Sequence, residues 1–192
     1  MGSLNFNNSG TIIKCFGVDG NNAPNARKNV EVLFYNSEED FAIKLKTKEG
    51  EEVILYKTSG ENKSFEENYK EIQRQQSNYS GKTVFEENDI LKIPFIKVSD
   101  EINYDELCGR GIKNCEYYIK QAIQTIDFEL NNVGGSIKSE AVIEATEKAF
   151  IECSRKMIFD SDFILYLKEE SKEQPYFALK VDNTDILLEG EL

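Results

Sequence analysis

The chain has 192 residues, of which 40% are hydrophobic and 30% are charged, and it carries a net charge of −12. This composition is typical of a globular protein, and the length suits one domain with a sizeable core, so we expect a single domain over residues 1–192. The acidic balance argues against a large phosphate-binding surface and against anionic membranes, because both need clustered Lys and Arg. We therefore expect neither a nucleic-acid partner nor a membrane partner.

Targeting signals are not visible in the sequence. No apolar run approaches the roughly 18 to 20 residues that cross a bilayer, and the start, MGSLNFNNSGTIIKC, lacks a basic stretch followed by an apolar block. The prediction is a soluble chain without a signal peptide.

The chain contains no histidine and has four cysteines, Cys15, Cys108, Cys115 and Cys153. The absence of histidine excludes Ser-His-Asp catalysis, Cys-His catalysis and every histidine metal site. A disulfide between Cys108 and Cys115 would close the loop GRGIKN, but without a secretion signal free thiols are favoured.

The first half of the chain predicts strands followed by a helix. Residues 1–29 form an N-terminal arm or edge strand, with one apolar segment at 11–18. Three alternating runs, 30–36, 40–47 and 51–59, predict a meander of two hairpins. Ser64, with Glu67 three residues later, then predicts a capping box that starts a helix over 64–76.

The second half predicts mainly strands. Residues 89–100 indicate a buried strand, a single helical turn ends at Gly109, and a long strand covers 117–135. Residues 157–170 and 174–183 then predict a final hairpin. The fold class that we expect is α+β, with antiparallel-dominated sheets and few helices.

Residues 133–153, VGGSIKSEAVIEATEKAFIEC, fit two interpretations. Read at period two they alternate like an extended segment, whereas at helical spacing Val142, Ala145, Ala149, Phe150 and Cys153 share one face. Helix-forming residues favour a helix from about Ser139 to Cys153. The sequence leaves both interpretations open, and an ordinary packing helix is one of them.

None of the usual motifs for catalysis or ion binding is complete. SGKT at residues 80–83 is preceded by Gln75 and Gln76 where a phosphate-binding loop needs a glycine. The acidic stretches 37–40 and 86–89 lack the ligand spacing of a calcium loop. Paired carboxylates, as in Asp160 with Asp162, merely share a strand face. We therefore expect no enzyme, no metal site and no cofactor.

Several stretches, taken in order, resemble the serpin family. YYIKQAIQTIDFELNNVGGSIKSEA resembles the serpin strand that runs through a hinge into the reactive loop, and MIFDSDFILYLKEESKEQPYFALKVDN resembles the strand pair after that loop. Upstream, KIPFIKV and DFAIKLKTKEGEEVILYKTS resemble a further strand and a hairpin of the family. The resemblance covers residues 30–183 and corresponds to the C-terminal half of a serpin.

The resemblance implies a set of site residues. Gly134, Gly135 and Ser136 would form the hinge, and Ala149, Phe150 and Ile151 would lie at the bond that a protease reads. With Gly134 as the hinge glycine, small residues and Ile137 face inward. With Gly135 instead, Lys138 and Glu140 face inward, and their unpaired burial would cost several kcal/mol.

The resemblance also implies a function. We expect a non-catalytic binding protein that presents residues 136–157 to a protein partner, with a protease as the partner class and non-inhibitory binding favoured over inhibition. This sequence departs from the family pattern at two places. Gln124 stands where a histidine is usual, and Asn131, Asn132 and Val133 stand where acidic residues usually precede the hinge. The alternative is a structural or assembly protein that reuses half of the fold as a homodimer, which would cover open sheet edges.

Overall fold

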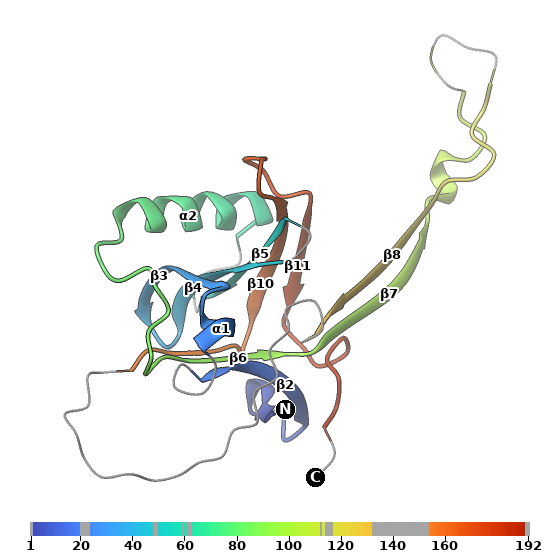
Figure 1. Ribbon diagram of the computed structural model, residues 1–192. Coiled ribbons are helices and arrows are strands. Elements are labelled where there is room, and N and C mark those ends of the chain that lie inside the picture. The colour runs from blue at the N-terminus through green and yellow to red at the C-terminus, as the bar shows by residue number, and fades with distance from the viewer. Residues whose placement is uncertain are drawn as a thin grey trace.

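Three β-sheets and the helix α2 (Phe65–Asn78) build the structure of the protein, a computed structural model (Figure 1). The structure describes residues 2–19, 24–47, 50–58, 60, 63–111, 113, 117–131 and 154–190. Most strand pairs are antiparallel, which confirms the predicted α+β class.

The largest sheet unites two parts of the chain that are far apart in sequence. Its five strands are β3 (Val30–Ser37), β4 (Asp40–Lys46), β5 (Glu51–Lys57), β10 (Phe163–Glu169) and β11 (Phe177–Val181), in the order β11-β10-β5-β4-β3. The predicted meander and the predicted final hairpin are therefore both confirmed. They join through the antiparallel pair β5 and β10, in which Leu55 lies opposite Leu165.

A four-stranded sheet packs against the first. Its strands are β1 (Gly2–Asn5), β2 (Ile12–Asp19), β6 (Ile90–Pro94) and β9 (Lys156–Ile158), in the order β1-β2-β6-β9. The strand expected at 11–18 is present, but it is not an edge strand, because β1 pairs with its outer side. Gly17 allows β2 to approach β6 closely, since a Cβ there would overlap the carbonyl oxygen of Leu91.

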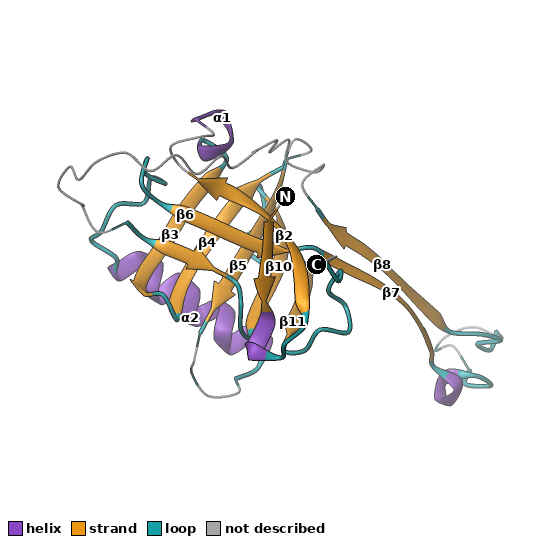
Figure 2. Ribbon diagram, turned by 90° about the horizontal axis from the view of Figure 1, so that it is seen from below, coloured by secondary structure: helices purple, strands orange, loops and turns teal. Residues whose placement is uncertain are grey.

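The third sheet is a two-stranded ribbon of β7 (Ile96–Asn103) and β8 (Ile123–Leu130). Figures 1 and 2 show that it projects from the rest of the molecule. A 3-10 turn, η2 (Asp105–Leu107), and Gly109 with φ +81° follow β7 and agree with the predicted helical turn. The predicted long strand at 117–135 is shorter than expected, because regular pairing begins only at Ile123.

Two runs that the sequence analysis treats as single strands each divide between two sheets. Residues 89–100 form β6 and β7, which belong to different sheets and are separated by the buried Phe95. Residues 157–170 likewise contain the end of β9 and all of β10. At Phe95 the apolar pattern continues across the change of sheet and does not reveal it. Between β9 and β10, by contrast, the polar residues Asp160, Ser161 and Asp162 interrupt the pattern.

Alternation along the five-stranded sheet creates two cores. Val53 and Leu55 of β5 face the four-stranded sheet and belong to the main core. Ile54 and Tyr56 face α2 and pack with Tyr69 and Ile72 of that helix. Both faces of β5 are thus buried, which explains its uninterrupted apolar run VILY.

Helix α2 begins as the sequence predicts. The backbone N–H of Glu67 donates to Ser64 Oγ, and the Glu67 carboxylate accepts from the backbone N–H of Ser64 at 2.9 Å. The hydroxyl of Tyr166 on β10 donates to the carbonyl of Phe65 at 2.8 Å, so the helix start is also fixed to the sheet. The remaining short elements are η1 (Phe6–Asn8), which buries Phe6, and α1 (Pro24–Arg27).

Candidate partner-binding surface

The predicted site residues lie between two described elements. Gly134, Gly135 and Ser136, and likewise Ala149, Phe150 and Ile151, fall outside the described residues. The described chain stops at Asn131, directly after β8, and resumes at Ser154, just before β9. The contacts around Asn131 and Ser154 therefore show how the described chain is held on each side of segment 132–153.

An ion pair between Arg155 and Asp89 fixes the point where the described chain resumes. The guanidinium Nε donates to Asp89 Oδ1 at 3.1 Å, and the backbone N–H of Arg155 donates to the same oxygen at 3.1 Å. The side chains are 12% and 3% exposed, respectively. Nη1 and Nη2 also donate to the carbonyls of Lys82 and Val84. The guanidinium is thus held by a carboxylate and two carbonyls.

The charge of Arg155 is maintained despite its burial. Burial alone would lower the pKa of Arg155, but hydrogen bonds to Asp89 and the charge of this carboxylate outweigh burial and raise the pKa. A buried pair of this kind fixes geometry, because removal of either partner leaves the other charge without compensation.

A second buried cation, Lys57, holds the far end of β9. Its Nζ donates to the carbonyl of Ile158 at 3.1 Å and to Asp160 Oδ1 at 2.7 Å, and it also pairs with Glu39 at 3.0 Å. The Lys57 side chain is only 3% exposed. Together with the parallel pairing of β9 to β6, these contacts hold residues 155–160 firmly against both sheets.

Neither ion pair is visible in the sequence, because the partners lie far apart along the chain. Asp89 belongs to the acidic stretch 86–89, whose spacing indicates only that it is not a calcium loop. In the structure Asp89 instead accepts from Arg155 and from the backbone N–H of Glu86 at 2.7 Å. Its partner lies 66 positions later, so no local spacing connects the two.

The four-residue motif SGKT at residues 80–83 has a structural role. It follows the end of α2 rather than joining a strand to a helix, so it lacks the context of a phosphate-binding loop. The carbonyl of Thr83 accepts from the backbone N–H of Val32 at 2.8 Å, and Phe85 is fully buried two residues later.

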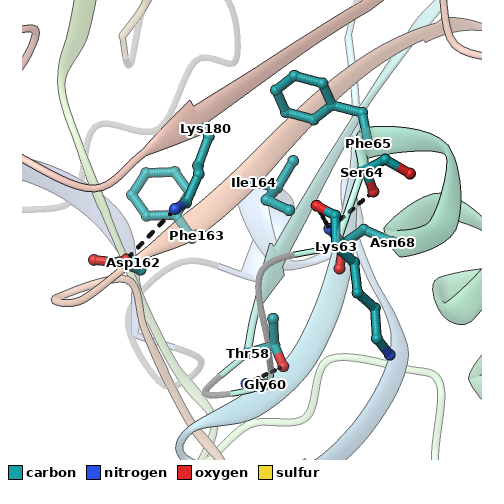
Figure 3. Close-up of a pocket in the computed structure, with 10 residues that line it drawn as sticks. All are labelled: Thr58, Gly60, Lys63, Ser64, Phe65, Asn68, Asp162, Phe163, Ile164 and Lys180. Atoms are coloured by element: carbon teal, nitrogen blue, oxygen red, sulfur yellow. Dashed lines mark hydrogen bonds and ion pairs between the residues drawn. The ribbon is translucent and has the colours of Figure 1, made fainter.

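A cleft opens between the start of α2 and strands β5, β10 and β11 (Figure 3). Its volume is about 270 Å³, slightly below the range of roughly 300–1,000 Å³ typical of small-molecule sites. Lys63, Lys180 and Asp162 line it together with Phe65 and Ile164, and Lys180 lies 4.0 Å from Asp162. The cleft mixes charged and apolar groups without a catalytic arrangement of side chains.

A charged cluster occupies a second cleft on the same face of the five-stranded sheet. Glu52 accepts from Lys168 at 2.6 Å and pairs with Lys44 at 3.2 Å. Burial would raise the pKa of Glu52, but hydrogen bonds from the two lysines lower it overall. Lys44 also pairs with Glu31 of β3 at 3.0 Å, so two lysines balance two carboxylates and the cluster ties β3, β4, β5 and β10 together.

The cysteines show no reactive arrangement where they are described. Cys15 and Cys108 are free, and burial raises the pKa of the Cys15 thiol, which disfavours the nucleophilic thiolate. Among the described residues, no group of His, Cys, Asp and Glu side chains is placed to hold a metal ion. In the same part of the chain, every helix is too short or too polar to cross a lipid bilayer.

No family model and no curated protein matches this sequence. The structure, however, is similar to solved structures. Serpin48, a highly specific serpin in the insect Tenebrio molitor, matches with a TM-score of 0.51 and 14% identity, over 93% of this chain and 49% of that one. Mouse protein-Z dependent protease inhibitor matches with a TM-score of 0.56 and 11% identity, over 90% and 45% of the two chains.

Thyroxine-binding globulin in complex with thyroxine matches with a TM-score of 0.54 and 11% identity, over 95% of this chain and 49% of that one. The chain therefore spans about half the length of each of these structures. At such low identity the similarity shows the fold alone. The described sheets have a serpin-like fold, of which this chain contains roughly one half.

Proposed function

We propose that this protein is a non-catalytic, serpin-like binding protein that presents residues 136–154 to a protein partner. The predicted segment, 136–157, is too long at its end, because Arg155 is bound to Asp89 and Met157 is fully buried in β9. The observation that carries the proposal is the double anchor of β9, formed by Arg155 with Asp89 and by Lys57 with Asp160. An anchor at this place holds one end of the segment against the body of the molecule. A partner can then bind the segment without loosening the sheets.

A protease is the partner class that we favour. Two of the structurally similar proteins are named as a serpin and as a protease inhibitor, which supports a protein partner of this class. Binding without inhibition is favoured over suicide inhibition. Insertion of the segment as an extra strand would bury either the bulky Ile137 or the charged Lys138 and Glu140.

The test is binding to catalytically inactivated proteases, one elastase-like and one chymotrypsin-like. The variant replaces Ala149, Phe150 and Ile151 by Gly-Ser-Gly, and the matched control makes the same change at Tyr117, Tyr118 and Ile119 at the end of the ribbon. We expect binding to be lost only in the first variant, with an unchanged melting temperature. Equal binding by both variants would contradict the proposal. A complex that survives SDS with an active protease would instead show inhibition.

A second candidate function is assembly with another polypeptide. The ribbon of β7 and β8 favours it, because an isolated two-stranded hairpin is only marginally stable in water. Sedimentation of the purified chain across a wide concentration range tests the homodimer form of this role. A monomer at every concentration would exclude the homodimer.

A further inference from the structure

A strap, residues 184–190, follows β11 and lies at the base of the ribbon (Figure 1). On one side, Glu189 of the strap pairs with Ile13 of β2 in an isolated antiparallel bridge. On the other side, Leu187 pairs with Ile96 of β7 in the same way. The strap therefore joins the four-stranded sheet to the ribbon, which are otherwise separate sheets.

The strap fills a fork between β2 and the chain that leads from β6 into β7. The pairing of β2 with β6 ends at a hydrogen bond of 3.0 Å from the backbone N–H of Phe95 to the carbonyl of Lys14. Beyond this bond, Leu188 lies between the two strands. Its N–H donates to the carbonyl of Phe95 at 3.1 Å, and its carbonyl accepts from the N–H of Lys14 at 2.8 Å. One residue of the strap is thus bonded to both sides of the fork.

Apolar side chains hold the strap in this fork. Leu187 is only 5% exposed and belongs to the main core, and Ile186 and Leu188 pack against the same core. Asp185 and Glu189, in contrast, are exposed. Burial of apolar side chains therefore binds the strap to the rest of the molecule in addition to its hydrogen bonds.

The strap also provides a backbone link between the ribbon and the body, which comprises the two larger sheets and α2. The backbone N–H of Lys97 donates to the carbonyl of Ile186 at 2.8 Å. Within the described part of the chain, no other backbone group of β7 or β8 bonds to a residue outside the ribbon. An isolated pair of strands is only marginally stable in water, so this link matters for how firmly the ribbon is held.

The bridge between the strap and β7 lies level with the end of β8. Ile96, which pairs with Leu187 on one side, pairs with Leu130 on the other. Leu130 is the last residue of β8, and segment 132–153 follows after Asn131. The strap is therefore one strand away from the point where the described chain stops before this segment.

We propose that the strap controls the mobility of the base of the ribbon, including the end of β8 that leads into segment 132–153. The inference rests on the proposed presentation of residues 136–154 and adds a means of regulating it. Arg155 and Lys57 hold the chain after the segment, whereas the strap holds the chain before it. When the strap leaves the fork, the ribbon loses its backbone link to the body, while the anchor of β9 keeps its contacts.

Amide hydrogen exchange on the full chain, resolved by residue with NMR, tests the proposal. In the unaltered protein, release of the strap would expose the N–H groups of Lys14, Lys97 and Leu188 together, because each takes part in a bond with the strap. We expect these three amides to show similar protection, and to exchange faster than the amides of β5 in the body.

A proline substitution removes the central bond of the strap. Leu188→Pro lacks the N–H that donates to Phe95, whereas Leu188→Ala keeps this N–H and loses the same side chain. The amides of Lys97 and Leu130 should exchange roughly three- to tenfold faster in Leu188→Pro than in Leu188→Ala, which is the effect of one hydrogen bond. Exchange within β5 should stay unchanged and shows that each variant is folded.

Glu189→Pro is the matched control for proline. Among the described residues, the backbone N–H of Glu189 has no hydrogen-bond partner. Proline at position 189 therefore removes no bond of the strap, and it favours the extended backbone in the residue before it. We expect the amides of Lys97 and Leu130 to exchange less than about threefold faster in this variant than in the unaltered protein.

Three results would overturn the proposal. They are equal exchange in Leu188→Pro and Leu188→Ala, equal acceleration in Glu189→Pro and Leu188→Pro, and exchange of Lys97 in the unaltered protein only together with the strands of the body. The third result needs no variant, so the proposal can be contradicted even if Leu188→Pro does not fold. Failure of residues 136–154 to bind a protease would leave these exchange rates unchanged, so the two proposals can fail separately.

Discussion

The body of the molecule and the ribbon are both built of antiparallel strands, yet they bury very different amounts of side chain. In the body, strands such as β5 and β10 are buried on both faces, between α2 and the four-stranded sheet. In the ribbon, every β7 residue beyond Val98 is exposed. Alternation alone therefore sets which side chains share a face, whereas burial depends on what the remaining chain places against that face.

The two regions should respond very differently to loss of a large side chain. Phe159 is fully buried and its ring lies 5.0 Å from Phe41 and 5.1 Å from Phe163. Phe159→Ala should lower the free energy of unfolding by about 3–5 kcal/mol, because it removes buried contacts and leaves a cavity. Ile102→Ala on the ribbon should change it by less than about 0.5 kcal/mol. Urea denaturation measures both, and equal losses would remove the contrast between the two regions.

Substitution of Arg155, which anchors the start of β9, should cause the next largest loss of stability. Arg155→Lys keeps the charge but cannot reproduce the forked contacts with Asp89 and two carbonyls, so we expect a loss of about 1–3 kcal/mol. Arg74→Lys is the matched control, because Arg74 pairs with Glu71 on the exposed surface of α2. Arg74→Lys should change stability much less, because solvent screens this exposed pair. Similar losses in the two variants would show that the buried pair is not an anchor.

The capping box of α2 should have a smaller effect. Ser64→Ala removes the acceptor for the backbone N–H of Glu67 and should cost about 1 kcal/mol in unfolding free energy. Ser77→Ala near the end of the same helix removes only a bond to the carbonyl of Gln73 and serves as the control. Thermal unfolding, monitored by circular dichroism, measures the stability of both variants. A larger loss in Ser77→Ala than in Ser64→Ala would contradict the capping role of Ser64.

Lowering the pH should cause the smallest of these losses of stability. The group responsible, Glu52, lies in the body of the molecule. The pKa of Glu52 is lowered in the folded protein, because hydrogen bonds from Lys168 and Lys44 outweigh its burial. A lowered folded pKa contributes stability that is present above the unfolded pKa of about 4.5 and is lost as the pH falls through the folded value. Glu52→Gln should therefore flatten the fall in urea midpoint below pH 4.5, and an unchanged profile would contradict this linkage.

Local patterns explain why parts of the fold were predictable. The meander, the start of α2 and the final hairpin depend on alternation or capping within a few residues, and all three are confirmed. The sheet change at Phe95 was not predictable, since apolar residues continue across it, whereas the polar residues Asp160, Ser161 and Asp162 mark the change after Phe159. The union of the meander with the final hairpin depends on β5 meeting β10 across more than a hundred positions.

The candidate site could be predicted from the sequence less well than the fold. Asp89 and Lys57 resemble ordinary surface charges in the sequence, and only the folded structure shows that Arg155 and Asp160 are their partners. Such pairs leave no periodic signal, because their members lie on different elements. The hinge and protease-reading residues were named by resemblance alone, and they stay predictions.

Limited proteolysis tests the central claim most directly. The protein is exposed briefly to an elastase-like enzyme, the first cut is mapped by mass spectrometry, and the melting temperature of the cut protein is measured. We predict a first cut within residues 136–154, before β9, with both fragments held together by the anchored strand and the five-stranded sheet. A first cut inside the body, with residues 136–154 left intact, would contradict presentation of this segment to a protein partner.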